Sequence, residues 1–188
     1  MGLTYFKRYR MDRNLDEDQI PVPDIGPEFE LLPFRADLLK HHATAKFESF
    51  RREMDVNVFP SLGRMDGCLR LMRDITGRND FVPQATWLVT HRRGPSSPVQ
   101  AVATVQGLMI DGWGAIQNLG VAAPFRGQRL GTLLLARAAL GFLEAGVRRM
   151  HLEVTVANTS AIRLYERLGF RRARTVYKAV DVAGSEKD

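Results

Sequence analysis

The sequence lacks the features that usually place a protein outside the reducing cytosol. It has one cysteine, Cys68, so no disulfide can form within the chain. Its first residues do not show the apolar segment of a signal peptide, and no run approaches the ~18 apolar residues that a membrane span needs. We therefore expect a cytoplasmic protein with no membrane partner.

Internal repeats and low-complexity segments are also absent from the 188 residues, 45% of which are hydrophobic and 26% charged. A chain of this length suits one domain with a sizeable core. We expect a single domain over residues 1–188.

The formal net charge of +6 raises the possibility of a nucleic-acid partner. However, the arginines are scattered among acidic residues, and the densest cluster is only Arg171, Arg172 and Arg174. Mild positive charge serves equally well to attract a polyanionic cofactor. We therefore do not expect nucleic acid to be the partner.

Hydrophobic periodicity predicts alternating strands and helices. Residues 3–10 could form an edge strand, and the proline-rich segment 14–27 reads as a surface linker. Further strands are expected at 29–34, 85–90, 99–110, 149–156 and from Phe170 onward. Helices are expected after a cap at Asp37, across 66–75, from Arg126, and after a cap at Asn158 or Thr159.

The most informative stretch is 116–135, in which an apolar strand pattern ends before Pro124 and a helix follows. Gly127 and Gly131 lie in the connection, next to Arg126 and Arg129. The first N–H groups of a helix have no intrahelical partner, so small residues there favour binding of a phosphate or pyrophosphate. The alternative is an ordinary strand-to-helix turn whose glycines serve the backbone angles. The stretch has neither the Walker pattern nor G-x-G-x-x-G.

Together with a second segment, H-L-E-V-T-V-A-N-T-S-A-I-R-L-Y-E-R-L-G-F, this stretch resembles the two signature segments of the GNAT N-acetyltransferase superfamily. The first resembles the acyl-CoA pyrophosphate loop, with Arg126, Arg129 and Gly131 at the motif positions. The second supplies Asn158, Ala161, Tyr165, Gly169 and Phe170. The resemblance covers residues 114–180, the expected acyl-CoA-binding core, and leaves 1–28 as an N-terminal arm and linker.

The resemblance implies an α/β (α+β) fold with a mixed, mostly antiparallel twisted sheet of about six to seven strands and about four helices. It implies acetyl-CoA as cosubstrate and no metal. Backbone groups of Leu119, Gly120 and Val121 would hold the pantetheine arm as an added strand would. The remaining implied cofactor contacts are Arg126, Gly127, Gln128, Arg129, Leu130, Gly131, Thr132, Asn158 and Ala161.

One motif position departs from the family pattern, because Arg129 stands where glycine is usual. We expect a helical conformation there, which any residue can adopt. The Arg129 side chain then either contacts a phosphate or points into solvent.

The implied chemistry is direct attack by an amine on the thioester in a ternary complex. Tyr165 is the candidate general acid for the departing sulfur, unless it only packs the last helix on the sheet. Glu153 is the candidate base, or else a paired or solvated strand carboxylate. Gln117 and Asn118 could order a water, and His151 is a further, less favoured candidate.

The acceptor pocket should use the first half of the chain, where Glu53, Asp55, Asn57 and Phe59 could hold a cationic or amide-bearing substrate, or form only a solvated loop. We expect an N-acetyltransferase acting on a primary amine, small or peptidic. The alternative is a non-catalytic acyl-CoA-binding sensor or scaffold of the same fold. A homodimer is possible.

Overall fold

A seven-stranded mixed sheet organises the molecule. The computed structural model of the protein describes residues 2–182. The strands are β1 (Gly2–Asn14), β2 (Phe29–Pro33), β3 (Phe81–His91), β4 (Gln100–Ile110), β5 (Trp113–Val121), β6 (Arg149–Thr155) and β7 (Arg171–Val182). Their order is β2-β3-β4-β5-β6-β1-β7, and within residues 2–182 only β5 and β6 run parallel. The expected mostly antiparallel sheet is confirmed.

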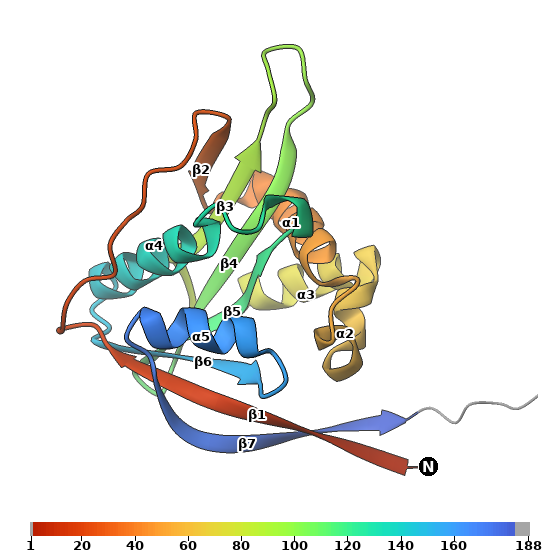
Figure 1. Cartoon of the computed structure of the whole chain (residues 1–188), viewed down its shortest axis with the longest axis vertical. Coiled ribbons are helices and arrows are strands. Elements are labelled where there is room, and N and C mark those ends of the chain that lie inside the picture. Colours follow the sequence, from red (N-terminus) through yellow and green to blue (C-terminus); the bar gives the residue numbers. More distant parts are fainter. Residues whose placement is uncertain (1, 183–188) are drawn as a thin grey trace, which may run out of the picture.

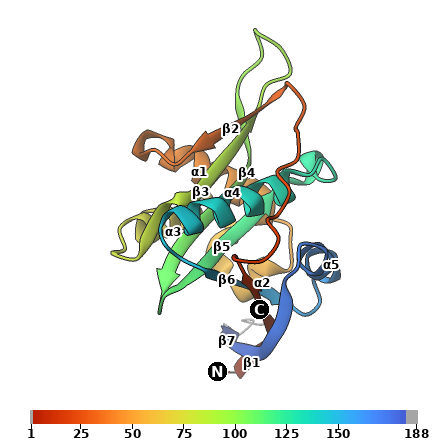
Figure 2. The same cartoon turned by 90° about the vertical axis from the view of Figure 1, so that its left-hand side faces the viewer.

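Helices cover both faces of this sheet (Figures 1 and 2). They are α1 (Leu39–Phe50), α2 (Asp55–Val58), α3 (Met65–Thr76), α4 (Leu130–Glu144) and α5 (Thr159–Arg167). α4 and α5 contribute to one large apolar core with the sheet, whereas α1 and α3 bury their apolar side chains in separate clusters. Burial of these amphipathic faces supplies most of the stability of helices this short.

The N-terminal strand β1 is not at a sheet edge, contrary to the expectation for residues 3–10. It pairs antiparallel with β6 along 8–14 and with β7 along 2–12, so both of its edges are hydrogen-bonded. Figure 1 shows β1 and β7 as a long ribbon below β6. The alternating pattern of these residues suits an inner strand equally well, because periodicity reports which face is buried and not how many neighbours a strand has.

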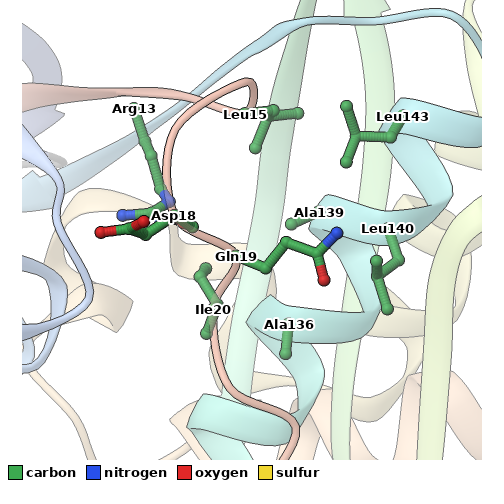
Figure 3. A pocket seen from close by; sticks show the side chains of 9 residues that line it. All are labelled: Arg13, Leu15, Asp18, Gln19, Ile20, Ala136, Ala139, Leu140 and Leu143. Carbon is green, nitrogen blue, oxygen red and sulfur yellow. Dashed lines mark hydrogen bonds between the residues drawn. The ribbon is translucent and has the colours of Figure 1, made fainter.

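The segment that follows β1 is more than a surface linker. Leu15 and Ile20 are each only 6% exposed. They lie opposite Ala136, Ala139 and Leu143 of α4, around a cavity of about 10 Å³ (Figure 3). The Arg13 guanidinium donates to the backbone carbonyls of Leu168 and Asp18. The linker therefore ties β1 to α4 and to the end of α5.

Several predicted boundaries hold and two do not. Strand β2 ends at Pro33, α3 ends against Gly77, and α5 is capped by Asn158 rather than Thr159. Asp37 is not a helix cap, because it lies inside a short 3-10 turn and pairs with Arg35 at 2.6 Å. The helix expected from Arg126 begins at Leu130, after a 3-10 turn over Ala123–Phe125.

Among the residues that the structure describes, no helix is both long enough and apolar enough to cross a membrane.

Candidate active site

A cleft opens where β5 and β6 separate. The two strands pair only at Gly114 with Met150 and Ala115 with His151 within the described residues. Three residues further along β5, Asn118 has a positive φ of 46°, and the register between β4 and β5 shifts at the same level. This irregularity bends β5 away from β6. The resulting cleft has a volume of about 450 Å³.

Most of the predicted cofactor residues line this cleft. They come from the end of β5, the turn before α4, and α5: Leu119, Gly120, Val121, Arg126, Gly127, Arg129, Leu130, Gly131, Thr132, Asn158 and Ala161. Gln128 is exposed and does not line it. Two segments more than twenty residues apart thus face one another across the opening.

The absence of a side chain at Gly120 lets α1 approach the cleft closely. A Cβ atom at this position would lie 2.7 Å from the Cβ of Ser49 and 2.8 Å from the ring of Phe50. Any larger residue would push the end of α1 away from β5. The close packing of α1 against this part of the cleft wall therefore depends on this glycine.

The turn before α4 is built from left-handed residues. Gly127 has φ of 76° and Arg129 has φ of 62°. The helical conformation expected for Arg129 is therefore wrong, since this residue caps α4 from outside the first turn. A left-handed conformation costs a residue with a Cβ about 1–2 kcal/mol, which explains why glycine suits the position. The turn leaves the first N–H groups of α4 at the cleft.

Three arginines give the cleft a positive lining. Arg126 and Arg129 were expected there, and Arg167 at the end of α5 joins them. Arg126 also bridges the two sides of the cleft, because its guanidinium donates to the carbonyls of Val121 (3.1 Å) and Ser49 (3.2 Å) and pairs with Glu53 (2.8 Å). Glu53 therefore belongs to the cleft wall, and Arg167 is a contact that sequence reasoning missed. Its position in the last turn of a helix carried no signal of its own.

Asn158 fixes the start of α5. Its side-chain oxygen accepts from the N–H of Ala161 at 3.2 Å and from the Ser160 hydroxyl at 3.1 Å. This N-cap orients the helix that carries Tyr165, about two turns further along. The helix face with Ala161, Leu164 and Tyr165 consequently lines the cleft.

A second, smaller cavity of about 80 Å³ adjoins the cleft. Residues common to the walls of both are Phe50, Asp55, Leu119, Asn158 and Tyr165. Tyr165 is 8% exposed, and burial raises the pKa of its phenol, with the negative charge of Asp55 adding to the rise. The Tyr165 side chain thus lies at the junction of two compartments of different size.

Two carboxylates face the small cavity, and they differ in their partners. Glu153 pairs with Arg8 of β1 at 2.8 Å, and Arg8 also donates to the Glu153 backbone carbonyl at 3.0 Å. Asp55 opens α2, and burial raises the pKa of its carboxyl, an effect partly offset by the positive charge of Arg8. Glu153 is therefore the paired strand carboxylate that the sequence left open as an alternative.

Arg8 was not expected at the site. Its guanidinium lies 4.9 Å from the ring centroid of Phe59, a second wall residue of the small cavity. The side chain is 10% exposed, and desolvation lowers its pKa. Only the position of β1 between β6 and β7 brings Arg8 here, and sequence spacing carried no sign of that pairing.

Other candidates lie elsewhere. Asn57 is exposed and lines neither cavity, and Gln117 lies on β5 outside both walls. His151 packs its ring 6.3 Å from that of Trp113, and burial lowers its pKa. Within residues 2–182, no three His, Cys, Asp or Glu side chains come together as a group able to hold a metal ion.

Buried polar side chains support the irregular part of β5 from behind. Lys46 of α1 is fully buried and its Nζ donates to Oδ1 of Asn118 at 3.0 Å. Burial lowers its pKa to about 7. One turn earlier, His42 Nδ1 lies 2.8 Å from the Thr104 hydroxyl, which accepts from Gln106 Nε2 at 2.6 Å. In the sequence, the four-residue spacing of His42 and Lys46 places them on one face of the helix, but it does not indicate that this face is buried.

Comparison with known proteins identifies the class that this geometry defines. Residues 64–170 match the model of the acetyltransferase (GNAT) family, which is more than half of the chain. The protein belongs to the GNAT acetyltransferase family, and the resemblance found in the sequence is confirmed.

Individual relatives are more distant. The chain is 41% identical over 64 residues to N-alpha-acetyltransferase MAK3 of Arabidopsis thaliana, over 34% of each chain. Among solved structures, a GCN5-related N-acetyltransferase from Sphaerobacter thermophilus superposes with a TM-score of 0.67 at 23% identity, over 95% of this chain and 52% of that one. The Escherichia coli ribosomal-protein-S18-alanine N-acetyltransferase gives 0.54 at 17% identity, over 85% and 99%. These structures show the shared fold. The chain spans about half the length of the Sphaerobacter protein and a third of the Arabidopsis one.

Proposed function

We propose that the protein transfers an acetyl group from acetyl-CoA to a primary amine by direct attack in a ternary complex. The observation that carries this proposal is the position of Tyr165, which lines both the large cleft and the small cavity beside it. A residue at the junction of two binding compartments can act on a bond that is exchanged between their occupants. Family membership supports the same reaction class.

The large cleft suits acetyl-CoA. Its glycine turn and the N-terminus of α4 offer free N–H groups, and Arg126, Arg129 and Arg167 add positive charge for phosphates. Near the junction, β5 is unpaired on the side facing β6, so the backbone of Leu119, Gly120 and Val121 can hold an extended pantetheine arm. When bound, acetyl-CoA supplies the activated acetyl thioester.

The small cavity suits the amine. A volume of about 80 Å³ admits only a few non-hydrogen atoms, so it holds the amine group and the atoms next to it rather than a whole acceptor. Asp55 and Glu153 give its wall two carboxylates, and Phe59 gives an apolar surface. The similarity to a protein named N-alpha-acetyltransferase makes a peptide α-amine the first acceptor to test.

Tyr165 is the residue that we assign to the leaving group. A phenol held beside the sulfur can give its proton to the departing thiolate, and because burial raises its pKa, this transfer depends on close contact with the sulfur. Holding both substrates at this junction supplies a further part of the rate. A cytoplasmic location and a homodimer stay predictions.

Two measurements test the proposal. Titration calorimetry with CoA should give binding, and thiol release from acetyl-CoA should depend on added amine. The amine panel consists of short peptides with free α-amines, Nα-acetyl-lysine and spermidine. CoA binding with no turnover on any amine would favour the sensor or scaffold, and no CoA binding would contradict both.

Tyr165→Phe tests the assigned acid. We expect kcat to fall about 100-fold while the Kd for CoA stays the same, because the substitution removes the donor and leaves the ring. Unchanged turnover across the pH range would show that Tyr165 only packs α5 on the sheet.

A further inference from the structure

The small cavity contains two carboxylates, but only one of them is free to act on a substrate. We propose that Asp55, and not Glu153, accepts the proton of the attacking amine, while Glu153 is a positioning residue that holds Arg8 beside it. This inference rests on the proposed acetyl transfer and assigns its missing proton acceptor. It concerns an aspartate from the segment after α1, far in sequence from both signature segments.

Glu153 forms an ion pair with Arg8. Its carboxylate accepts from Arg8 at 2.8 Å, and its own backbone carbonyl accepts from the other terminal nitrogen of the same guanidinium. The Arg8 side chain is only 10% exposed. Both the carboxylate and the backbone carbonyl of Glu153 are therefore occupied by one guanidinium, which leaves Glu153 less available to a substrate.

Asp55 has no such ion pair among the described residues. Within residues 2–182, its carboxylate forms no ion pair and receives no hydrogen bond from another side chain, and the hydrogen bond that it does accept comes from its own backbone. It lines both compartments, as Tyr165 does. An amine that reaches the junction from the small cavity therefore meets a free carboxylate and a phenol in the wall that the two compartments share.

The charged groups around Asp55 come from β1, α5 and β6 and from the turn just before α2. Arg8 of β1 stabilises the Asp55 carboxylate, and Glu53 of the turn before α2 destabilises it. Tyr165 of α5 faces it as a neutral phenol, and Glu153 of β6 neutralises part of the Arg8 charge. The net result is a carboxyl whose pKa is raised by burial, so its carboxylate is a stronger base than an exposed aspartate.

The proton balance closes with these two side chains. An amine that arrives as an ammonium ion first loses its extra proton to water. As the neutral amine attacks, the C–N bond forms, Asp55 takes one nitrogen proton, and the C–S bond breaks with its electron pair going to sulfur. Tyr165 protonates that thiolate. The tyrosinate then regains a proton from the Asp55 carboxylic acid, so neither side chain has gained or lost a proton after one turnover.

The experiment compares Asp55→Asn with Glu153→Gln, using whichever amine of the panel turns over fastest. The pH profile of kcat at saturating amine and acetyl-CoA reports groups that titrate in the ternary complex. Asp37→Asn is the matched control, because Asp37 is exposed and pairs with Arg35 far from either cavity. Calorimetry with CoA on each variant checks that the cleft is intact.

We expect Asp55→Asn to lower kcat about 100-fold at pH 7 and to abolish the acid limb of the profile, with the Kd for CoA unchanged. Glu153→Gln should keep that limb and move it to lower pH, because Arg8, released from Glu153, then stabilises the Asp55 carboxylate more strongly. Asp37→Asn should match the wild type.

The inference is overturned if Asp55→Asn keeps more than a third of the wild-type kcat, or if Glu153→Gln loses the acid limb. A wild-type protein that binds CoA but acetylates no amine would overturn the proposed function, and this assignment with it. The two failures are distinguishable because the first requires active wild-type enzyme.

Discussion

The large cleft and the small cavity meet at Tyr165, yet they are built in opposite ways. Three backbone features shape the cleft, whose wall also carries side chains: the unpaired end of β5, a turn with two left-handed residues, and the start of α4. The small cavity is lined by residues of six helices and strands (β1, α1, α2, β5, β6 and α5), among them Arg8, Asp55 and Glu153. A backbone site can be specified by one short stretch, whereas a side-chain site depends on long-range pairing.

This difference suggests how the two compartments divide their work. The backbone and the motif glycines suit a ligand that is the same in every member of a family, and the side chains of the small cavity suit a variable acceptor. The comparison can be tested by substitutions that act on one compartment and spare the other. The following predictions run from the largest expected effect to the smallest.

Lys46→Met acts on the buried polar side chains of α1 that support the irregular part of β5 at Asn118. In the wild type, Lys46 has a pKa of about 7 in the folded protein and about 10.4 when unfolded. Between pH 7 and 8.5 the unfolded chain therefore holds a proton that the folded protein has largely lost, so stability rises with pH. We expect the free energy of unfolding of the wild type, relative to Lys46→Met, to rise by roughly 1.5 kcal/mol over this range.

Denaturant titrations of both proteins at the two pH values measure this difference. Titrating groups that do not interact with Lys46 are common to both proteins and cancel, and both proteins carry Cys68→Ala because the Cys68 thiol does interact with Lys46. Parallel pH dependences of wild type and variant would show that Lys46 stays charged in the folded state.

Gly127→Val acts on the backbone-built cleft. A Cβ atom at Gly127 would meet no atom within 4 Å, so the main effect of the substitution falls on the left-handed backbone. Strain of this kind amounts to about 1–3 kcal/mol, and we expect the Kd for CoA to rise about 10-fold or more. Gln128→Ala in the same turn, outside the cleft wall, should leave calorimetric binding unchanged. Equal affinity in both variants would contradict a backbone-built phosphate site.

Arg129→Gly should have the smallest effect, because its effects on the stability of the folded state and on the freedom of the unfolded chain oppose each other. The substitution relieves the left-handed strain but gives the unfolded chain more freedom, so we expect the free energy of unfolding to change by less than about 1 kcal/mol. Loss of one positive charge from the cleft should raise the Kd for CoA about 3-fold. Arg163→Ala, the same charge change at an exposed site outside the cleft wall, is the control, and an equal loss of affinity there would mean that only net charge matters.

The prediction from sequence succeeded where structure is local. Pro124, Gly127 and the apolar spacing after Leu130 were enough to predict strand, turn and helix, and the turn lines the cleft. The Asn158 cap and the seven-stranded mixed sheet also follow from short-range pattern and family resemblance. Arg129 is the local failure, since the sequence does not reveal that α4 begins only at Leu130 and that Arg129, its N-cap, is left-handed.

What the sequence alone determined is therefore the turn beside the proposed cofactor cleft, because backbone angles and free helix N–H groups are set by neighbours within a few residues. Only the tertiary structure decided the small cavity that we propose for the acceptor. It inserted β1 between β6 and β7, and that insertion placed Arg8 against Glu153, 145 residues away, while Asp55 kept no such partner. Strand pairing over such distances is decided by burial of whole faces in the sheet, and no spacing along the chain records it.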